Sequence, residues 1–155
     1  MSQAILGLGS NISPDQNLPE ALRQLARLVK VLAVSSRWET AAVGSNGPAF
    51  LNAAVLIETD LSSQALKQQV LAHIESVLGR IRTADKNAPR TIDLDILFFA
   101  GEVFDPNLFR LDHLILPVAE IAPELCEPAT GKSMRVLAKE HCCKPTAVCV
   151  GPLLY

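Results

Sequence analysis

The sequence predicts an α+β protein with the element order β-α-β-β-α-β, followed by a C-terminal extension. Three observations support this. Four segments have the length and apolar content of strands, two segments have apolar residues at helical spacing, and the helical segments separate strands in the order just given. This order is typical of the ferredoxin-like fold, so we expect an antiparallel sheet with helices on one face. The length of 155 residues and the 49% hydrophobic content fit a single domain covering residues 1–155.

The first half of the chain contains the first helix and three of the strands. Gln3–Leu8 is an apolar run that ends in a glycine-rich turn, and Ser13 and Pro14 open a helix. Val34–Thr40 forms the second strand, and Phe50–Glu58 alternates between two faces as the third. The apolar stripe of the helix comes from Leu18, Leu22, Leu25, Val29 and Leu32.

The second helix precedes a basic loop and the fourth strand. Asp60 or Ser62 can cap this helix, and Gly79 is well placed to end it. Its apolar stripe is Leu66, Val70, Ile74 and Leu78, and the fourth strand is Thr91–Phe99. Farther on the pattern weakens. There we expect one helical turn at 118–121, a short helix at 133–140 and a tail at 144–155 that is irregular or an edge strand.

Charge and composition exclude several classes of protein. A net charge of −2 argues against general binding to nucleic acid, because that requires an excess of positive charge. No apolar run approaches the roughly 20 residues that span a membrane, and the N-terminus lacks the features of a signal peptide. We therefore expect a cytoplasmic protein. Of the four cysteines, Cys142 and Cys143 follow His141, but the spacing is not that of a zinc site, so we expect reduced, partly buried thiols.

The most informative segment is the basic loop together with the strand behind it. Its cations are Arg80, Arg82, Lys86 and Arg90. In the strand, Ile92, Leu94, Ile96 and Phe98 are expected to face a core, which places Asp93 and Asp95 side by side on the other face, roughly 6.5 Å apart. Two carboxylates this close repel each other, and a shared cation would relieve the repulsion. Carboxylates beside a basic loop suit a magnesium–nucleotide site.

Simpler interpretations exist for each of these residues. An Asp-x-Asp pair on a strand is often only a solvated face, and Arg80 and Arg82 could compensate the dipole at the end of the preceding helix. Glu75 is expected to be a charge on an exposed helix face, with support of the arginines as the minority interpretation. For Arg80 and Arg82, the position in one loop with Arg90 favours phosphate binding.

The residues from Lys86 to Leu97, KNAPRTIDLDIL, resemble the signature of the 6-hydroxymethyl-7,8-dihydropterin pyrophosphokinase family. Four further segments match it in the same order along the chain, over about residues 4–125. They are Leu8–Asn11, Phe50–Val55, Gly79–Arg82 and a segment with Pro117 and Glu120–Glu124. The family transfers the pyrophosphoryl group of ATP to a reduced pterin in folate biosynthesis, with two magnesium ions.

The resemblance implies a role for each group of candidate residues. Asp93 and Asp95 would hold both Mg²⁺ ions, and Arg80, Arg82, Lys86 and Arg90 would contact the nucleotide phosphates. Arg80 and Arg90 would be catalytic together with the two aspartates. The pterin would contact Thr40, Ala42, Val43 and Asn52. Phe50 shares a strand face with Asn52, so it can stack on the flat ring while Asn52 hydrogen-bonds its edge.

The chain departs from the family pattern in the segment Leu108–Pro117. The Pro-His-Pro of the family is absent, the segment is shortened, and the second stacking aromatic falls on His113.

On the strength of the motif matches, we expect a pterin pyrophosphokinase that uses ATP and magnesium. The alternatives are a divergent paralogue of weak or altered activity that acts as a pterin- or nucleotide-binding module, and an unrelated ferredoxin-like domain. We expect a monomer, with a weak homodimer as the alternative.

Overall fold

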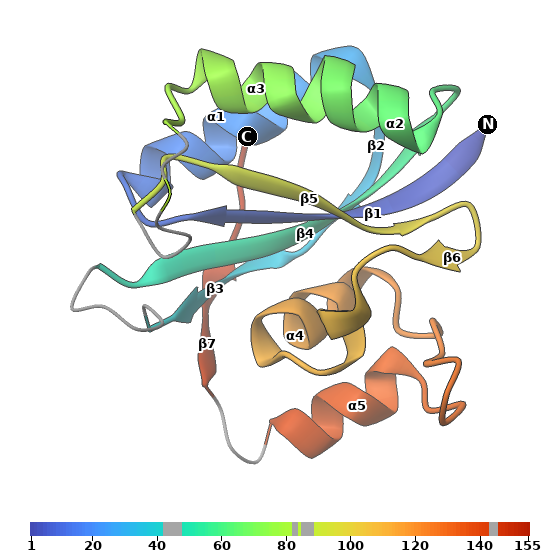
Figure 1. Cartoon of the computed structure of the whole chain (residues 1–155). Helices are drawn as coiled ribbons and strands as arrows, with labels where there is room; N and C mark the ends of the chain where they lie inside the picture. The colour runs from blue at the N-terminus through green and yellow to red at the C-terminus, as the bar shows by residue number, and fades with distance from the viewer. Residues whose placement is uncertain (42–47, 82–83, 85–88, 143–145) are drawn as a thin grey trace.

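A computed structural model describes residues 1–41, 48–81, 84, 89–142 and 146–155. These residues form one antiparallel sheet of seven strands with helices packed on both faces (Figure 1). The order across the sheet is β6-β5-β1-β4-β3-β7, and β2 also pairs with β4. The strands are β1 (Ser2–Ser10), β2 (Lys30–Val34), β3 (Ser36–Thr40), β4 (Phe50–Thr59), β5 (Asp93–Phe99), β6 (Glu102–Val103) and β7 (Ala147–Pro152).

The first face of the sheet carries the two helices of the β-α-β-β-α-β unit, as predicted. They are α1 (Pro14–Leu28) and a longer helix made of α2 (Ser63–Ala65), the π-helical η1 (Leu66–Leu71) and α3 (Ala72–Val77). The predicted stripe of Leu66, Val70 and Ile74 is buried against the sheet. Figure 1 shows both helices on the same side. The ferredoxin-like arrangement is therefore confirmed for this unit.

The second face is covered by the C-terminal extension, through α4 (Asp112–Ile121), α5 (Met134–His141) and the short 3₁₀ helix η2 (Pro106–Phe109). A separate apolar core lies here, formed by Ile5, Ala54, Leu97, Leu108, Phe109, Ile115, Val118, Met134 and Leu137. The prediction of a single helical turn at 118–121 was wrong, because α4 begins at Asp112 and continues through Pro117. Proline removes one backbone hydrogen bond, and burial of the apolar side chains around it outweighs that loss.

The boundary between α1 and the second strand also differs from the prediction. The helix ends at Leu28, so Val29 and Leu32 do not belong to it, and the chain enters the sheet at Lys30. The expected strand is divided at Ser35, whose backbone NH donates to Ala54 while its Oγ accepts from the NH of Ala54. Pairing with β4 decides the conformation of this valine-rich segment, which local spacing made look helical.

Strand β5 changes its pattern at Leu97. Ile92 and Leu94 are buried on the first face and Ile96 packs against them, as predicted. The pairing of β5 with β1 then shifts register, since Leu6 pairs with Ile96 and Ile5 with Phe98. The extra residue, Leu97, turns Phe98 toward the second core, so the prediction that Phe98 shares a face with Leu94 was wrong.

The last segment forms β7, which pairs with β3 as an edge strand. This confirms the edge-strand interpretation of the tail, and α5 confirms the predicted short helix. Within the described ranges, no helix is long and apolar enough to cross a membrane.

Candidate functional site

A cavity of about 670 Å³ lies between the sheet and the start of α4. Among the described residues, six of the predicted site residues line it, namely Thr40, Phe50, Asn52, Arg90, Asp93 and His113. A smaller cavity of about 200 Å³ shares Gly9, Asn52, Asp93 and His113 with it and extends to Asp95. A third, of about 500 Å³, also contains Asp95 and is bordered by Lys67 and Asp105. The fold thus brings residues from distant parts of the chain to a set of cavities that share lining residues.

Two glycines of β1 form part of the cavity floor. Gly9 pairs with Asp93 and Gly7 pairs with Asp95 across the sheet. A Cβ atom on Gly9 would lie 3.3 Å from Oδ1 of Asn52, and one on Gly7 would lie 3.3 Å from Cδ1 of Leu97. Side chains at these positions would crowd Asn52 and Leu97, so glycine allows these two side chains to pack directly against the backbone of β1. The sequence suggested only a turn here, whereas β1 continues to Ser10.

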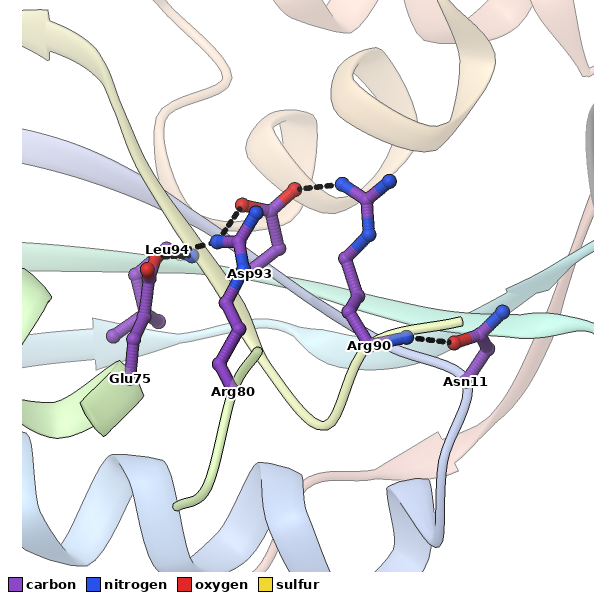
Figure 2. A network of polar contacts seen from close by, with 6 residues as sticks. All are labelled: Asn11, Glu75, Arg80, Arg90, Asp93 and Leu94. Carbon is purple, nitrogen blue, oxygen red and sulfur yellow. Dashed lines mark hydrogen bonds and ion pairs between the residues drawn. The ribbon is translucent and has the colours of Figure 1, made fainter. Parts of the chain in front are cut away.

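Asp93 is held by two arginines (Figure 2). Its Oδ1 lies 2.8 Å from Nη1 of Arg80, and its Oδ2 lies 2.8 Å from Nη1 of Arg90. Each carboxylate oxygen therefore accepts a charge-assisted hydrogen bond. The cationic groups that balance Asp93 in this structure belong to the protein itself.

Asp95 has a different environment. Its side chain is exposed toward the cavities, and among the described residues it makes no hydrogen bond or ion pair. Desolvation and the negative charges of Asp93, Glu75 and Asp105 raise its pKa from the ordinary 3.8 to about 6. No group of three or more His, Cys, Asp or Glu side chains with the arrangement of a metal site occurs in the part of the chain that the structure describes.

Glu75 corrects one of the predictions. It is only 4% exposed, so it is not a charge on an exposed helix face. Its Oε1 lies 2.9 Å from Nη1 of Arg80 and accepts a 3.0 Å hydrogen bond from the backbone NH of Leu94. Arg80 thus lies between the Glu75 and Asp93 carboxylates, and the interpretation that Glu75 supports an arginine is confirmed (Figure 2).

Asn11 holds the backbone of Arg90. Its Oδ1 accepts from the NH of Arg90 at 2.7 Å (Figure 2). The backbone NH of Asn11 also donates to the carbonyl of Arg90 at 3.2 Å. The guanidinium of Arg90 lies over the Phe50 ring, 5.6 Å from the ring centroid, which is within cation–π distance. Asn11 was interpreted only as part of a turn. The one sequence signal for its role was its place in the family motif.

The amide of Asn52 is oriented by β3. Its Nδ2 donates to Oγ1 of Thr40 at 2.9 Å and to the carbonyl of Trp38 at 3.4 Å. The indole of Trp38 donates to Glu120 on α4 at 2.6 Å, and Ser36 donates to the same carboxylate. Glu120 was not singled out by its chemistry in the sequence. It shows its role only once α4 packs beside β3.

His113 lies on the first turn of α4 and lines the same cavity as Phe50. Burial lowers the pKa of its imidazole, and the carboxylates of Asp105 and Asp112 oppose this only in part. The ring is therefore neutral at neutral pH. A neutral imidazole offers a flat surface without the cost of desolvating a charge.

Four predicted site residues lie outside the described residues, namely Ala42, Val43, Arg82 and Lys86. Cys143 is outside them as well. Cys126, Cys142 and Cys149 are free and exposed, so the expected partial burial of the thiols was wrong for these three. They lie on the C-terminal extension, whose helix and edge strand leave them at the surface.

The model of the family described as 7,8-dihydro-6-hydroxymethylpterin-pyrophosphokinase (HPPK) matches residues 5–123. A 2-amino-4-hydroxy-6-hydroxymethyldihydropteridine pyrophosphokinase from Synechocystis is 34% identical over 151 residues, covering 90% of this chain and 76% of that protein. The enzyme of the same name from Methylorubrum extorquens is 37% identical over 137 residues, covering 81% of this chain and 85% of that enzyme.

Solved structures agree with this fold. A crystal structure of Plasmodium falciparum HPPK-DHPS with pteroate matches with a TM-score of 0.69 at 13% identity. The match covers 90% of this chain and 42% of that one, so this chain spans less than half of that protein. At this identity the likeness supports the fold alone. The family match, which covers more than half of the chain, and the curated relatives together show that the chain belongs to the 7,8-dihydro-6-hydroxymethylpterin-pyrophosphokinase family.

Proposed function

We propose that this protein transfers the pyrophosphoryl group of ATP to the hydroxymethyl oxygen of 6-hydroxymethyl-7,8-dihydropterin and releases AMP. As a member of its family, the chain is an ATP-dependent pyrophosphokinase of folate biosynthesis. The observation that carries the site assignment is one cavity that joins Phe50, Asn52 and His113 to the Arg90–Asp93 pair. A flat acceptor and a triphosphate would meet where these two sets of residues adjoin.

The acceptor end suits a planar heterocycle. Phe50 and His113 supply two aromatic rings on the cavity wall, and the amide of Asn52 supplies an acceptor oxygen. Thr40 and Trp38 orient that amide before a ligand enters. We propose that these residues bind the pterin, together with Ala42 and Val43.

The phosphate end suits a magnesium–triphosphate. Asp95 lines two cavities without a partner among the described residues, and neighbouring carboxylates raise its pKa. A divalent cation fits such a donor set, because it would stabilise the ionised form of Asp95 and replace the arginines on Asp93. We propose that Asp93 and Asp95 hold two Mg²⁺ ions. When bound, the ions would neutralise phosphate charge and orient the triphosphate.

The arginines would change partners when ATP binds. Arg80 and Arg90 lie on the two oxygens of Asp93, within the region where phosphate would be bound. We propose that both guanidiniums leave Asp93 and bind phosphate oxygens as metal takes up the charge of Asp93. We propose that Arg82 and Lys86 also contact the phosphates. The hydroxymethyl oxygen of the pterin then forms a bond to the β-phosphorus of ATP. The bond between that phosphorus and the oxygen that remains with AMP breaks, and the proton of the hydroxymethyl group is released.

The location and assembly state follow as expectations. Since the reaction consumes ATP, we propose a cytoplasmic location. We propose a monomer, with a weak homodimer as the alternative, and no role for nucleic acid or membrane.

The decisive experiment incubates the purified protein with ATP, Mg²⁺ and 6-hydroxymethyl-7,8-dihydropterin and separates the nucleotides. We expect AMP in an amount equal to the pterin diphosphate formed, and none when either substrate is omitted. ADP as the product, or binding of both substrates without turnover, would overturn the proposal. The second result would favour a binding module instead.

A further inference from the structure

The first turn of α4, which carries His113, is weakly held by its own helix. Leu111 is its N-cap residue and provides no side-chain cap. Pro117, four residues after His113, has no NH to donate to the His113 carbonyl. Two of the interactions that usually fix a helical turn are thus missing where the chain places a wall of the cavity.

Asp112, the residue before His113, has contacts that compensate for these losses. Its Oδ1 is hydrogen-bonded to Nδ1 of His141 at the end of α5. Its Oδ2 accepts from Oγ1 of Thr146 at 2.6 Å and from the NH of Thr146 at 3.2 Å, immediately before β7. The Asp112 side chain is only 11% exposed, which makes these contacts more effective than surface ones.

Charge supports the same role. Partial burial acts to raise the pKa of Asp112, but the hydrogen bonds from Thr146 and His141 outweigh it and hold that pKa below its ordinary value. Asp112 is therefore an anion at neutral pH. Its negative charge strengthens the contacts with His141 and Thr146, and it also stabilises the first turn of α4, because an acidic side chain there interacts favourably with the helix dipole.

We infer that Asp112, His141 and Thr146 form a clasp through which the C-terminal segment positions the His113 ring in the acceptor cavity. Asp112 and Thr146 themselves line that cavity beside His113, whereas His141 is not among the described residues that line it. Asp112 is a positioning residue, because it acts through the ring that follows it. The inference rests on the proposed function of the cavity and adds the C-terminal extension to the acceptor site.

The test compares Asp112→Ala, Asp112→Asn and His141→Ala with the unaltered protein. If the clasp orients a stacking ring, Asp112→Ala and His141→Ala each raise the KM for the pterin about five-fold, while the KM for ATP and kcat change less than about two-fold. Asp112→Asn keeps an acceptor for Thr146 and recovers most of the loss. The double variant Asp112→Ala/His141→Ala resembles Asp112→Ala, because removal of the aspartate already breaks the contact with His141.

Glu140→Gln is the matched control. Glu140 also lies on α5 and pairs with Lys132 at the surface, and it does not line the cavity, so its loss leaves both KM values unchanged. Equal increases in the two KM values, additive effects in the double variant, or an unchanged pterin KM would overturn the inference. If the unaltered protein forms no AMP and calorimetry shows no pterin binding, the proposed function fails first. With an active protein, only the clasp is in question.

Discussion

Oε1 of Glu75 lies 2.9 Å from Nη1 of Arg80, and the pair connects the end of α3 to the strand that carries Asp93. Both side chains are largely buried, with 6% and 11% of their surface exposed. A buried charge without a partner destabilises the folded protein, so the Glu75 carboxylate and the Arg80 guanidinium stabilise each other in this buried position. The pair places Arg80 beside Asp93 before any ligand is present.

Replacing Glu75 tests this relationship. Glu75→Ala removes one of the two carboxylates that bind Arg80 and the acceptor of the Leu94 NH, so we expect about 3 kcal/mol loss in the free energy of unfolding by urea. Glu75→Gln keeps an acceptor and loses less. In both variants kcat falls more than pterin affinity, since Arg80 is displaced. Equal stability of the two variants would contradict the ion-pair account.

Asp93 and Asp95 have opposite effects on the stability of the ligand-free protein. Asp93→Ala removes one of the two carboxylates that bind Arg80 and the carboxylate that pairs with Arg90, and it is expected to destabilise the protein by about 2 kcal/mol. Asp95→Ala removes a carboxylate for which desolvation and repulsion by Asp93, Glu75 and Asp105 outweigh the attraction to Arg80, so stability is unchanged or higher. Thermal unfolding compares the two. Both variants should lose Mg²⁺-dependent ATP binding in calorimetry, and unchanged nucleotide affinity would refute the metal assignment.

The raised pKa of Asp95 predicts a specific pH dependence. The folded protein holds this proton up to a pH of about 6, whereas the ordinary value is 3.8, so the unaltered protein loses stability as the pH rises between these values. Asp95→Asn lacks this loss. We expect the variant to match the unaltered protein near pH 4 and to exceed it by about 1 kcal/mol at pH 8, a figure reduced for solvent screening. A constant difference across the range would contradict this.

Magnesium should remove the same penalty. Because the cation binds the ionised carboxylate, we expect added Mg²⁺ to raise the Tm of the unaltered protein at pH 8 more than at pH 5. The variant Asp95→Asn is the control, and its Tm should respond less at both values. Equal responses of the two proteins at pH 8 would show that Asp95 does not bind the ion.

Asn52 should act on the acceptor and not on the nucleotide. Asn52→Ala removes the amide that Thr40 and Trp38 orient, so pterin binding is expected to weaken about ten-fold. The affinity for ATP with Mg²⁺ should change little, because within the described ranges the Asn52 amide donates to Thr40 and Trp38 and not to Asp93. Calorimetry with each ligand decides the order, and a larger loss for ATP would contradict the assignment.

His113→Phe should strengthen acceptor binding. A benzene ring stacks on a flat heterocycle over a larger area than imidazole does, so we expect about five-fold tighter pterin binding. The lowered pKa of His113 means that the unaltered protein loses affinity as the pH falls below the ordinary histidine value and the ring gains a charge. The phenylalanine variant should lack that part of the pH profile. Weaker binding by the variant at pH 8 would show that His113 is not a stacking surface.

Much of the fold is predictable from the sequence because it depends on local patterns. The spacing of Leu66, Val70 and Ile74 defines a helix that buries one stripe, and the alternation in β4 marks two buried faces. The basic loop and the two aspartates, together with their order along the chain, indicate a nucleotide site. These features involve residues close together in sequence, whose side-chain directions follow from helix and strand geometry.

The tertiary structure decided what depends on distant partners. Pairing with β4 ended α1 at Leu28, the pairing of β1 with β5 turned Phe98 to the other face, and the second core extended α4 across Pro117. The burial of Glu75, the hold of Asn11 on Arg90 and the contact between Asp112 and His141 also arise only on folding. A charged or polar side chain takes its role from the partner that shields it from water, and the spacing of residues along a single chain does not identify that partner.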